Sequence, residues 1–330
     1  MSNLHCIQFL TIQAQFVKTS RARHLLELYL SADSLETCRL LKHLLEESEM
    51  HETIAVIFDF DDTLAPDSTT GYLRKSGITD LPAFWKGVAG LFSDDWDPVP
   101  AYLYKMIEAS RSGHIPPITR ESFSEWGKEL PLHEGVAGMF ERLRIIARET
   151  NPRANVEFYL ISSGIGDVLR STRIAHEFTD IWASEFHYDS NGHAVFPKKV
   201  VSFTDKTRYL FQIQKGLVGP KSKGKPFDVN KKMEPAQIHI PISSMIFVGD
   251  GYTDIPCFSL VKKEGGVSIA VFDKSHADKW GRAYQFIQDG RVSNLLSANY
   301  SADSDLSIFL GMAVRKIAAD VALSGRTYQG

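Results

Sequence analysis

The chain has 330 residues, of which 43% are hydrophobic and 23% are charged, and its formal net charge is −3. This balance excludes a strongly basic surface for nucleic acid and allows two domains, or one large α/β domain with an insertion. Three scattered cysteines have no disulfide or metal-ligand spacing, and we find neither a membrane-spanning apolar run nor a secretory signal. We therefore expect a cytoplasmic protein without nucleic-acid or membrane partners, and the oligomeric state stays open.

Residues 1–49 differ in pattern from the rest of the chain. Leucines at helical spacing predict an amphipathic helix over residues 33–47, and residues 21–30 suit a shorter one. The apolar core pattern begins only at Thr53, and Met50 lies just ahead of it. We expect residues 1–49 to be a helical N-terminal extension, or an addition from an upstream start codon.

The segment IAVIFDFDDTL, residues 54–64, predicts a buried strand that ends in a group of acidic side chains. Side chains two apart on an extended chain point to the same side, so Asp59 and Asp61 share one cleft while Phe60 turns away. Two carboxylates roughly 6 Å apart repel by about 2–3 kcal/mol at an effective dielectric near 20. This pair therefore needs a cation, a retained proton, or both.

Two structural interpretations of the same acidic segment are simpler. A carboxylate after a strand can cap the following helix, and DxD triplets also occur by chance. A helix-loop-helix calcium site is disfavoured because Leu64 and Thr70 stand where that loop needs glycine and a bidentate glutamate.

Residues 65–150 are rich in aromatic residues and helical in period. We predict helices over residues 84–91, 102–111, 121–128 and 135–148. Aromatic and basic side chains here could line a substrate site, although core packing is the commoner role for such aromatics and solvated charge the commoner role for such cations. The candidates are Trp85, Trp96, Trp126, Tyr102, Tyr104, Arg74, Lys75 and Arg111.

The remaining chain alternates strands with helices, which predicts a parallel sheet covered on both faces. Predicted strands cover residues 156–161, 244–248 and 266–271, and predicted helices cover residues 165–176, 204–214 and 306–323. A β-hairpin is expected around Asn191-Gly192. The lysine-rich segment KSKGKPFDVNKK, residues 221–232, could bind phosphate, but a solvated loop is favoured.

Polar residues follow three of these buried strands, as DFD, SSG and GDG. Because ligands in open α/β sheets bind outside the carboxyl ends of the strands, Asp59, Asp61, Ser162 and Asp250 should meet at one edge. Lys206 would join them from the first turn of a helix that Thr204 caps. A cation is unfavourable at that positive helix end by about 0.3–1 kcal/mol, which indicates a neighbouring negative charge.

Together these motifs resemble the haloacid dehalogenase-like (HAD) hydrolase superfamily. DFDDT at residues 59–63, YLISSG at 159–164, Lys206 opening a helix, and GDGYTD at 249–254 occur in the order of that family's motifs. The resemblance covers about residues 53–273. It implies an α/β fold, a doubly wound Rossmann-like parallel sheet, with an inserted α-helical cap. On this basis we assign residues 50–64 and 151–300 to the core, 65–150 to a C1-type cap and 301–330 to a C-terminal helix.

The resemblance also implies a role for each matching residue. Asp59 would be the nucleophile that forms an aspartyl-phosphate, and Asp61 would be the general acid and then the base. Ser162, Ser163 and Lys206 would bind the phosphoryl group. Asp59, the backbone carbonyl of Asp61, and Asp250 would hold Mg²⁺, with Asp254 supporting them from behind. Carboxylates and waters are ligands that Mg²⁺ prefers, and a cation is required before a carboxylate attacks a phosphate dianion.

The resulting hypothesis is a Mg²⁺-dependent phosphatase that hydrolyses a small phosphomonoester, with a small phosphorylated metabolite as its partner. An acid at position 61 favours phosphomonoester hydrolysis over dehalogenase or transport-ATPase chemistry. A phosphomutase or phosphotransferase and a non-catalytic phosphate-binding regulatory protein stay open as alternatives. The chain is most similar to the phosphoserine phosphatase-like branch, but that branch has a glutamate shortly after the nucleophile loop where this chain has APDST, and Asp67 is a weak substitute.

Overall fold

A seven-stranded sheet forms the centre of the computed structural model, which describes residues 52–274 and 277–327. The helical extension predicted for residues 1–49 lies outside this range. The strand order is β4-β3-β2-β1-β5-β6-β7, and neighbours pair in parallel except β3 with β4. The strands are β1 (Thr53–Phe58), β2 (Asn155–Ile165), β3 (Asp180–Tyr188), β4 (Ala194–Lys199), β5 (Met245–Gly249), β6 (Val267–Phe272) and β7 (Asn294–Ser297). The predicted α/β class with a mostly parallel sheet is confirmed.

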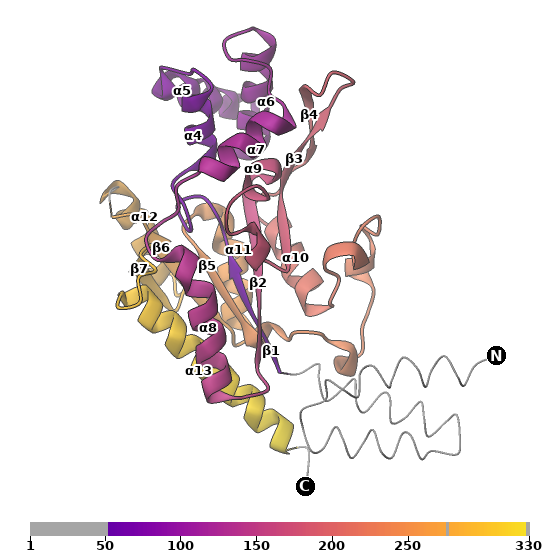
Figure 1. Ribbon diagram of the computed structural model, residues 1–330, viewed down its shortest axis with the longest axis vertical. Coiled ribbons are helices and arrows are strands. Elements are labelled where there is room, and N and C mark those ends of the chain that lie inside the picture. The colour runs from indigo at the N-terminus through magenta and orange to yellow at the C-terminus, as the bar shows by residue number, and fades with distance from the viewer. Residues whose placement is uncertain (1–51, 275–276, 328–330) are drawn as a thin grey trace, which may run out of the picture.

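The chain winds outward from β1 in both directions, as Figure 1 shows. Strands β2 and β3 follow on one side of β1, and β5, β6 and β7 then follow on the other. This is the doubly wound order, in which the crevice outside the carboxyl ends of the two strands at the reversal point is the usual ligand site. Here those strands are β1 and β5.

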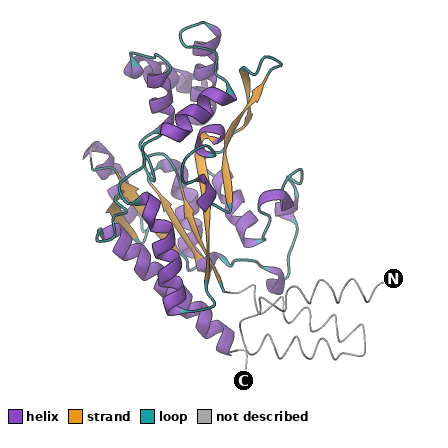
Figure 2. Cartoon of the chain, in the orientation of Figure 1, coloured by secondary structure: helices purple, strands orange, loops and turns teal. Residues whose placement is uncertain are grey.

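Alternate side chains of β1 enter two hydrophobic cores, one on each face of the sheet. Ile54, Val56 and Phe58 belong to one core, while Ala55 and Ile57 belong to the other. Each fully buried aliphatic or aromatic side chain of this kind contributes about 1.5–3 kcal/mol. Helices cover both faces (Figure 2), and those that pack on the sheet are α8 (Val136–Thr150), α10 (Asp205–Gln214), α11 (Ile255–Lys263), α12 (Ala277–Gln288) and α13 (Asp305–Thr327).

Four further helices stand beyond the carboxyl edge of the sheet, at the top of Figure 1. They are α4 (Ser68–Lys75), α5 (Leu81–Gly90), α6 (Pro98–Arg111) and α7 (Arg120–Glu129). We call these four helices the cap. The β3–β4 hairpin extends to the cap, where the N–H of Ala194 donates to the carbonyl of Ile118 at 2.8 Å. The cap is therefore connected to the core by an edge hairpin as well as by the chain.

Helix α8, which we predicted as part of the inserted segment up to residue 150, packs on the sheet instead. Its buried face includes Met139, Phe140 and Leu143, and the rings of Phe140 and Phe158 of β2 lie 4.9 Å apart. Helix α13 lies beside α8 on the same face (Figure 1). The buried apolar face of α8 thus packs against β2 and α13.

The helix predicted over residues 165–176 is much shorter in the structure. Only α9 (Gly166–Leu169) forms, and the hydroxyls of Ser171 and Thr172 donate to carbonyls of Asp167 and Leu169. Hydroxyls that bond to nearby backbone compete with helix propagation. The sequence patterns also missed α4, α11, α12 and β7.

Short 3₁₀ helices complete the described chain. They are η1 (Leu91–Asp94), η2 (Ala175–Glu177), η3 (Gly219–Lys221), η4 (Asp228–Asn230), η5 (Pro235–Gln237), η6 (Ile242–Ser244) and η7 (Tyr252–Asp254). Among the helices that the structure describes, none combines the length and the apolar character needed to cross a bilayer.

Candidate active site

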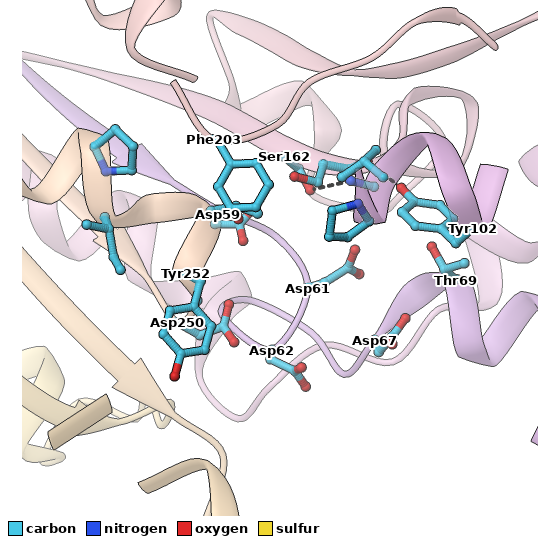
Figure 3. Close-up of a pocket in the computed structure, with 18 of the residues that line it drawn as sticks. Asp59, Asp61, Asp62, Asp67, Thr69, Tyr102, Ser162, Phe203, Asp250 and Tyr252 are labelled. Atoms are coloured by element: carbon cyan, nitrogen blue, oxygen red, sulfur yellow. Dashed lines mark hydrogen bonds between the residues drawn. The ribbon is translucent and has the colours of Figure 1, made fainter. Parts of the chain in front are cut away.

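The carboxyl ends of β1 and β5 bring Asp59 and Asp250 together. The two strands pair in parallel with Phe58 opposite Val248, and the N–H of Asp59 extends the ladder by donating to the Val248 carbonyl at 2.9 Å. Asp250 follows Gly249, the last residue of β5. Figure 3 shows both carboxylates facing the same space. The predicted convergence of these two residues is therefore present.

Asp61 lies in the turn after β1 and faces the same cavity as Asp59. The N–H of Ser68, at the start of α4, donates to Asp61 Oδ1 at 2.7 Å. Phe60 between them is fully buried, as the alternation predicted. Gly164 lies near the end of β2, where a Cβ would be 2.7 Å from Asp61 Oδ2. Only glycine at this position leaves room for the Asp61 carboxyl.

The SSG motif ends β2 beside these acids. Ser162 is buried, and its Oγ accepts from the N–H of Gly164 at 3.0 Å, which leaves the hydroxyl hydrogen available to a ligand. The carbonyl of Ser163 accepts from the hydroxyl of Tyr102 in cap helix α6 at 2.6 Å. Ser163 Oγ is buried without a hydrogen-bond partner among the described residues.

Lys206 is fully buried in the first turn of α10 and points into the acidic cluster. Its Nζ lies 2.7 Å from Asp254 Oδ1 and 3.2 Å from Asp59 Oδ1. The expectation that a lysine opposing the helix dipole has a negative neighbour is thus correct. Thr204 precedes the helix, but its side chain makes no capping hydrogen bond, so that part of the prediction is wrong.

Asp254 holds Lys206 in place from the end of η7. It is fully buried, its Oδ1 accepts from Lys206, and its Oδ2 accepts from the N–H of Gly251 at 3.1 Å. Gly249 has no room for a side chain, because a Cβ there would lie 2.5 Å from Asp254 Oδ2. Asp254 therefore bonds with both oxygens inside the protein.

Burial and mutual repulsion set the protonation of the acids. Burial raises the pKa of Asp59 to about 6, against the opposing effect of the Lys206 ammonium. Burial, with Asp67 nearby, raises the pKa of Asp61 well above its usual value, and burial with Asp59 does the same for Asp250. Burial opposes the charge of Lys206, but Asp254 and Asp59 outweigh it and raise the pKa of the ammonium. The site thus holds a permanent cation and a surplus of carboxyl groups.

The carboxyl groups fit a hard divalent cation. Oxygens of Asp59, Asp250 and Asp254 lie within 4.8 Å of one another. Asp59 Oδ1 is buried, and apart from its ion pair with Lys206 it has no hydrogen-bond partner among the described residues. Asp254 is the weakest ligand of the three because both its oxygens already accept hydrogen bonds. The Asp61 carboxyl turns toward Ser68 and stays outside this group. Asp59 and Asp250 are therefore the carboxylates that would hold Mg²⁺.

A cavity of about 830 Å³ opens from these residues toward the cap. Aromatic and apolar residues of both the cap and the core line it: Trp85, Pro98, Val99 and Tyr102 from the cap, and Phe203, Tyr252, Ile255 and Pro256 from the core, with Phe203 beside Asp59 and Tyr252 beside Asp250 in Figure 3. Phe203 has a φ of 39°, a left-handed conformation that costs a non-glycine residue energy and is often found at functional sites. Arg291 is the one cation lining this cavity in the described part of the chain. The sequence patterns gave no signal for Phe203, Tyr252 or Arg291.

The side chains that we considered as substrate contacts in the cap divide into two groups. Trp85 and Tyr102 line the cavity. The other aromatic residues pack within the cap or bond to it: Trp126 donates to the Ser68 carbonyl, and Trp96 packs on Tyr104. Of the basic residues, Lys75 pairs with Glu129 and Arg111 donates to the Val195 carbonyl. Arg74 is exposed. Core packing and solvation are thus the commoner roles here.

Asp67, the residue that we considered in place of the glutamate of phosphoserine phosphatases, has a structural role. It is the N-cap of α4, with Oδ1 accepting from the N–H of Thr70 and Oδ2 from its hydroxyl, both at 2.8 Å. Both oxygens are therefore occupied within the protein, although the residue lines the cavity.

The comparisons with known proteins agree with this geometry. The model of the haloacid dehalogenase-like hydrolase family matches residues 56–259. The chain therefore belongs to the haloacid dehalogenase-like hydrolases.

The individual proteins and structures that the chain resembles have low sequence identity to it. An uncharacterized protein of Borreliella burgdorferi is 26% identical over 284 residues, which cover 78% of this chain and 95% of that protein. The crystal structure of a HAD family hydrolase from Salmonella enterica serovar Typhi has a TM-score of 0.52 at 12% identity, covering 86% of this chain and 81% of that one. A phospho-aspartyl intermediate analogue of phosphoserine phosphatase has a TM-score of 0.46 at 17% identity, covering 79% and 99%.

Proposed function

We propose that this protein is a Mg²⁺-dependent phosphatase that hydrolyses a phosphomonoester through an aspartyl-phosphate on Asp59. One observation carries the proposal: the buried chain Asp254–Lys206–Asp59 fixes a permanent cation against one carboxylate, while Asp61 lies beside it outside that ion pair. The arrangement distinguishes two neighbouring acids by environment, which is how enzymes separate a nucleophile from a general acid.

In the first half of the reaction, a carboxylate oxygen of Asp59 attacks phosphorus and the bond from phosphorus to the ester oxygen breaks. The Asp61 carboxyl, whose raised pKa keeps its proton, transfers that proton to the departing alcohol oxygen. Ser162 and Lys206 provide donors for the phosphoryl oxygens. Mg²⁺ held by Asp59 and Asp250 would supply the positive charge that offsets repulsion between carboxylate and phosphate dianion.

In the second half, Asp61 is a carboxylate and removes a proton from water. The water oxygen attacks phosphorus, the bond between phosphorus and Asp59 breaks, and inorganic phosphate leaves. Asp61 thereby regains the proton it gave away, and Asp59 regains its carboxylate. No further reactant is needed.

The cavity supports a substrate larger and less polar than a phosphorylated amino acid. Its volume of about 830 Å³ lies within the usual range for drug-sized ligands, and eight of its lining residues are aromatic or apolar. Among the described residues of the cap, Asp67 is the one carboxylate that lines the cavity, and each of its oxygens already accepts a hydrogen bond from Thr70. The proposed partner is a small phosphorylated metabolite whose alcohol portion is a ring or another apolar group.

A panel of phosphomonoesters tests the proposal. Phosphate release should require Mg²⁺, stop in EDTA and favour aryl and nucleoside monophosphates over phosphoserine. Asp59→Asn should release no phosphate while its circular dichroism matches the unmodified protein. Hydrolysis by Asp59→Asn or in EDTA would contradict the mechanism, and transfer of phosphate to an added alcohol would favour a phosphotransferase.

A further inference from the structure

A second cavity, of about 530 Å³, shares no lining residue with the catalytic cavity. It is bordered by β3, by the end of β4, by helix α10 and by the loop of residues 219–226. We call it the basic pocket, because five of its lining side chains are cationic: Arg170, Lys199, Arg208, Lys223 and Lys225. The last two belong to the lysine-rich segment for which the sequence favoured a solvated loop.

The basic pocket contains one acidic side chain, Asp180, and its oxygens are used by the backbone. Asp180 Oδ1 accepts from the N–H of Ile181 at 2.8 Å, and Oδ2 accepts from the N–H of Gly219 at 2.7 Å. Asp180 therefore holds the loop against β3 and makes no ion pair with the pocket cations within the described chain. These hydrogen bonds leave the charge of Asp180 in place, so the pocket lining carries five cationic side chains and one anionic side chain.

Two of the five cations form ion pairs with acids in the described part of the chain. Arg170 lies 2.7 Å from Glu185, and Arg208 lies 3.3 Å from Asp205. Lys199 is partly buried and forms no ion pair with any described residue, and its Nζ lies 5.3 Å from the ring centre of Tyr209. Burial lowers the pKa of the Lys199 ammonium, as do Arg170 and Arg208, against the opposing effect of Glu185 and Asp180. A partly desolvated cation that has a ring contact but no ion pair is costly, and a bound anion would offset that cost.

Two further polar atoms of the basic pocket lack partners among the described residues. They are Nε of Arg208, a donor, and Oε1 of Gln212, an acceptor on a side chain that is 8% exposed. Buried polar atoms are nearly always hydrogen-bonded, so unpaired ones indicate a missing ligand or water. A phosphate group offers charged oxygens to Arg208 and, when it carries a proton or a neighbouring hydroxyl, a donor to Gln212.

We propose that the basic pocket binds a small phosphate-bearing anion at a site separate from the catalytic cavity. A phosphate group fits better than a single carboxylate because its oxygens point in several directions and it carries more charge, which matches cations on β4, α10 and the loop. The volume leaves room for a second phosphate or a small organic group beyond the first. The sequence segment that we expected to be solvated thus forms one wall of a binding site.

Calorimetric titration with inorganic pyrophosphate in EDTA tests this site. The residues changed in the variants line the basic pocket and not the catalytic cavity, so their effect on saturable binding distinguishes the two sites. The unmodified protein should bind one pyrophosphate, and Lys199→Met should weaken binding at least about tenfold. Absence of saturable binding by the unmodified protein would overturn the proposal.

A second variant guards against misfolding of Lys199→Met. Lys223→Gln combined with Lys225→Gln changes only exposed loop residues, and it should also weaken binding several-fold. Lys232→Gln is the matched control: Lys232 lies in the same segment, pairs with Glu234 and does not line the pocket. Unchanged affinity in the loop double variant, or equal losses in Lys232→Gln, would also refute the site.

Discussion

Lys206 and Asp254 form an ion pair of 2.7 Å in which both side chains are completely buried. Charges buried this deeply persist because each satisfies the other, and removing one partner leaves the other uncompensated. The same ammonium reaches Asp59, so the pair connects the stability of the fold to the reactive carboxylate.

Lys206→Met should lower both stability and activity. Loss of one partner of a buried pair costs about 3–5 kcal/mol, and loss of a charge that stabilises the transferring phosphoryl group costs about 10²–10³-fold in rate. Urea unfolding and phosphate release measure the two effects. Lys232→Met, at an exposed lysine, should change neither. Normal turnover in Lys206→Met would exclude this lysine from the phosphoryl site.

Asp61→Asn should slow hydrolysis by about 10²–10⁴-fold, the usual contribution of a general acid–base group. Asp59 still attacks substrates with good leaving groups, so the phosphorylated enzyme should accumulate. Intact-protein mass spectrometry after rapid mixing detects that species. Asp62→Asn is the control, since Asp62 follows Asp61 directly and lines the same cavity. Its hydrolysis rate should fall by less than tenfold. Equal losses in the two variants would contradict a special role for Asp61.

The contribution of Asp59 to the stability of the metal-free protein should fall as pH rises from about 4 to 6. Burial raises the pKa of Asp59 from 3.8 to about 6, so the folded protein binds this proton more tightly than the unfolded chain does. The stability that the proton provides is complete below 3.8 and disappears as pH rises through the folded value. Thermal unfolding of the unmodified protein and of Asp59→Asn in EDTA across this range measures the effect as the difference between the two. A difference that stays constant over this interval would contradict the inferred crowding of acids.

Asp250→Asn should stabilise the metal-free protein at pH 7. Burial, Asp59 and Asp254 raise the pKa of Asp250, so an uncharged side chain relieves repulsion. The melting temperature in EDTA should rise by about 2–4 °C, the shift that a gain of ~1 kcal/mol in the free energy of unfolding produces in larger domains. Added Mg²⁺ should stabilise the unmodified protein but not this variant. A Mg²⁺ response that survives in Asp250→Asn would place the metal elsewhere.

Tyr102→Phe should weaken closure of the cap over the core. The hydroxyl donates to the Ser163 carbonyl, and burial keeps its pKa well above the usual value, so it stays a donor. Loss of such a bond costs about 1 kcal/mol net, or about fivefold in kcat/KM. Tyr104→Phe is the matched control on the same helix, because Tyr104 is exposed and its hydroxyl bonds, among the described residues, to Glu108 alone at 3.4 Å. Equal effects of the two substitutions would show that the cap–core bond has no catalytic consequence.

Local sequence patterns were enough to predict the strands that end in polar residues. Strand β1 is a continuous apolar run, so its end at Asp59 and its central place in a parallel sheet follow from burial alone. Lys206 was predictable because its charge opposes the dipole of its own helix.

Other parts of the site depend on contacts between distant segments, which no local pattern encodes. Phe203 and Tyr252 meet at the cavity only because α10 and α11 pack on one face of the sheet. The apolar stripe of α8 could be read from the sequence, but not whether it would pack on the cap or on the sheet. The role of Asp67 as a helix cap required knowing that α4 begins at Ser68.

The six residues of β1 are all buried, and paired strands flank it on both sides, whereas α5 of the cap buries only Val88. Backbone amides next to the nucleophile should thus exchange with deuterated solvent among the slowest in the chain, and those of α5 among the fastest. Admission of a bulky ester can then proceed through fluctuations of the outer helices while the attacking oxygen remains stationary.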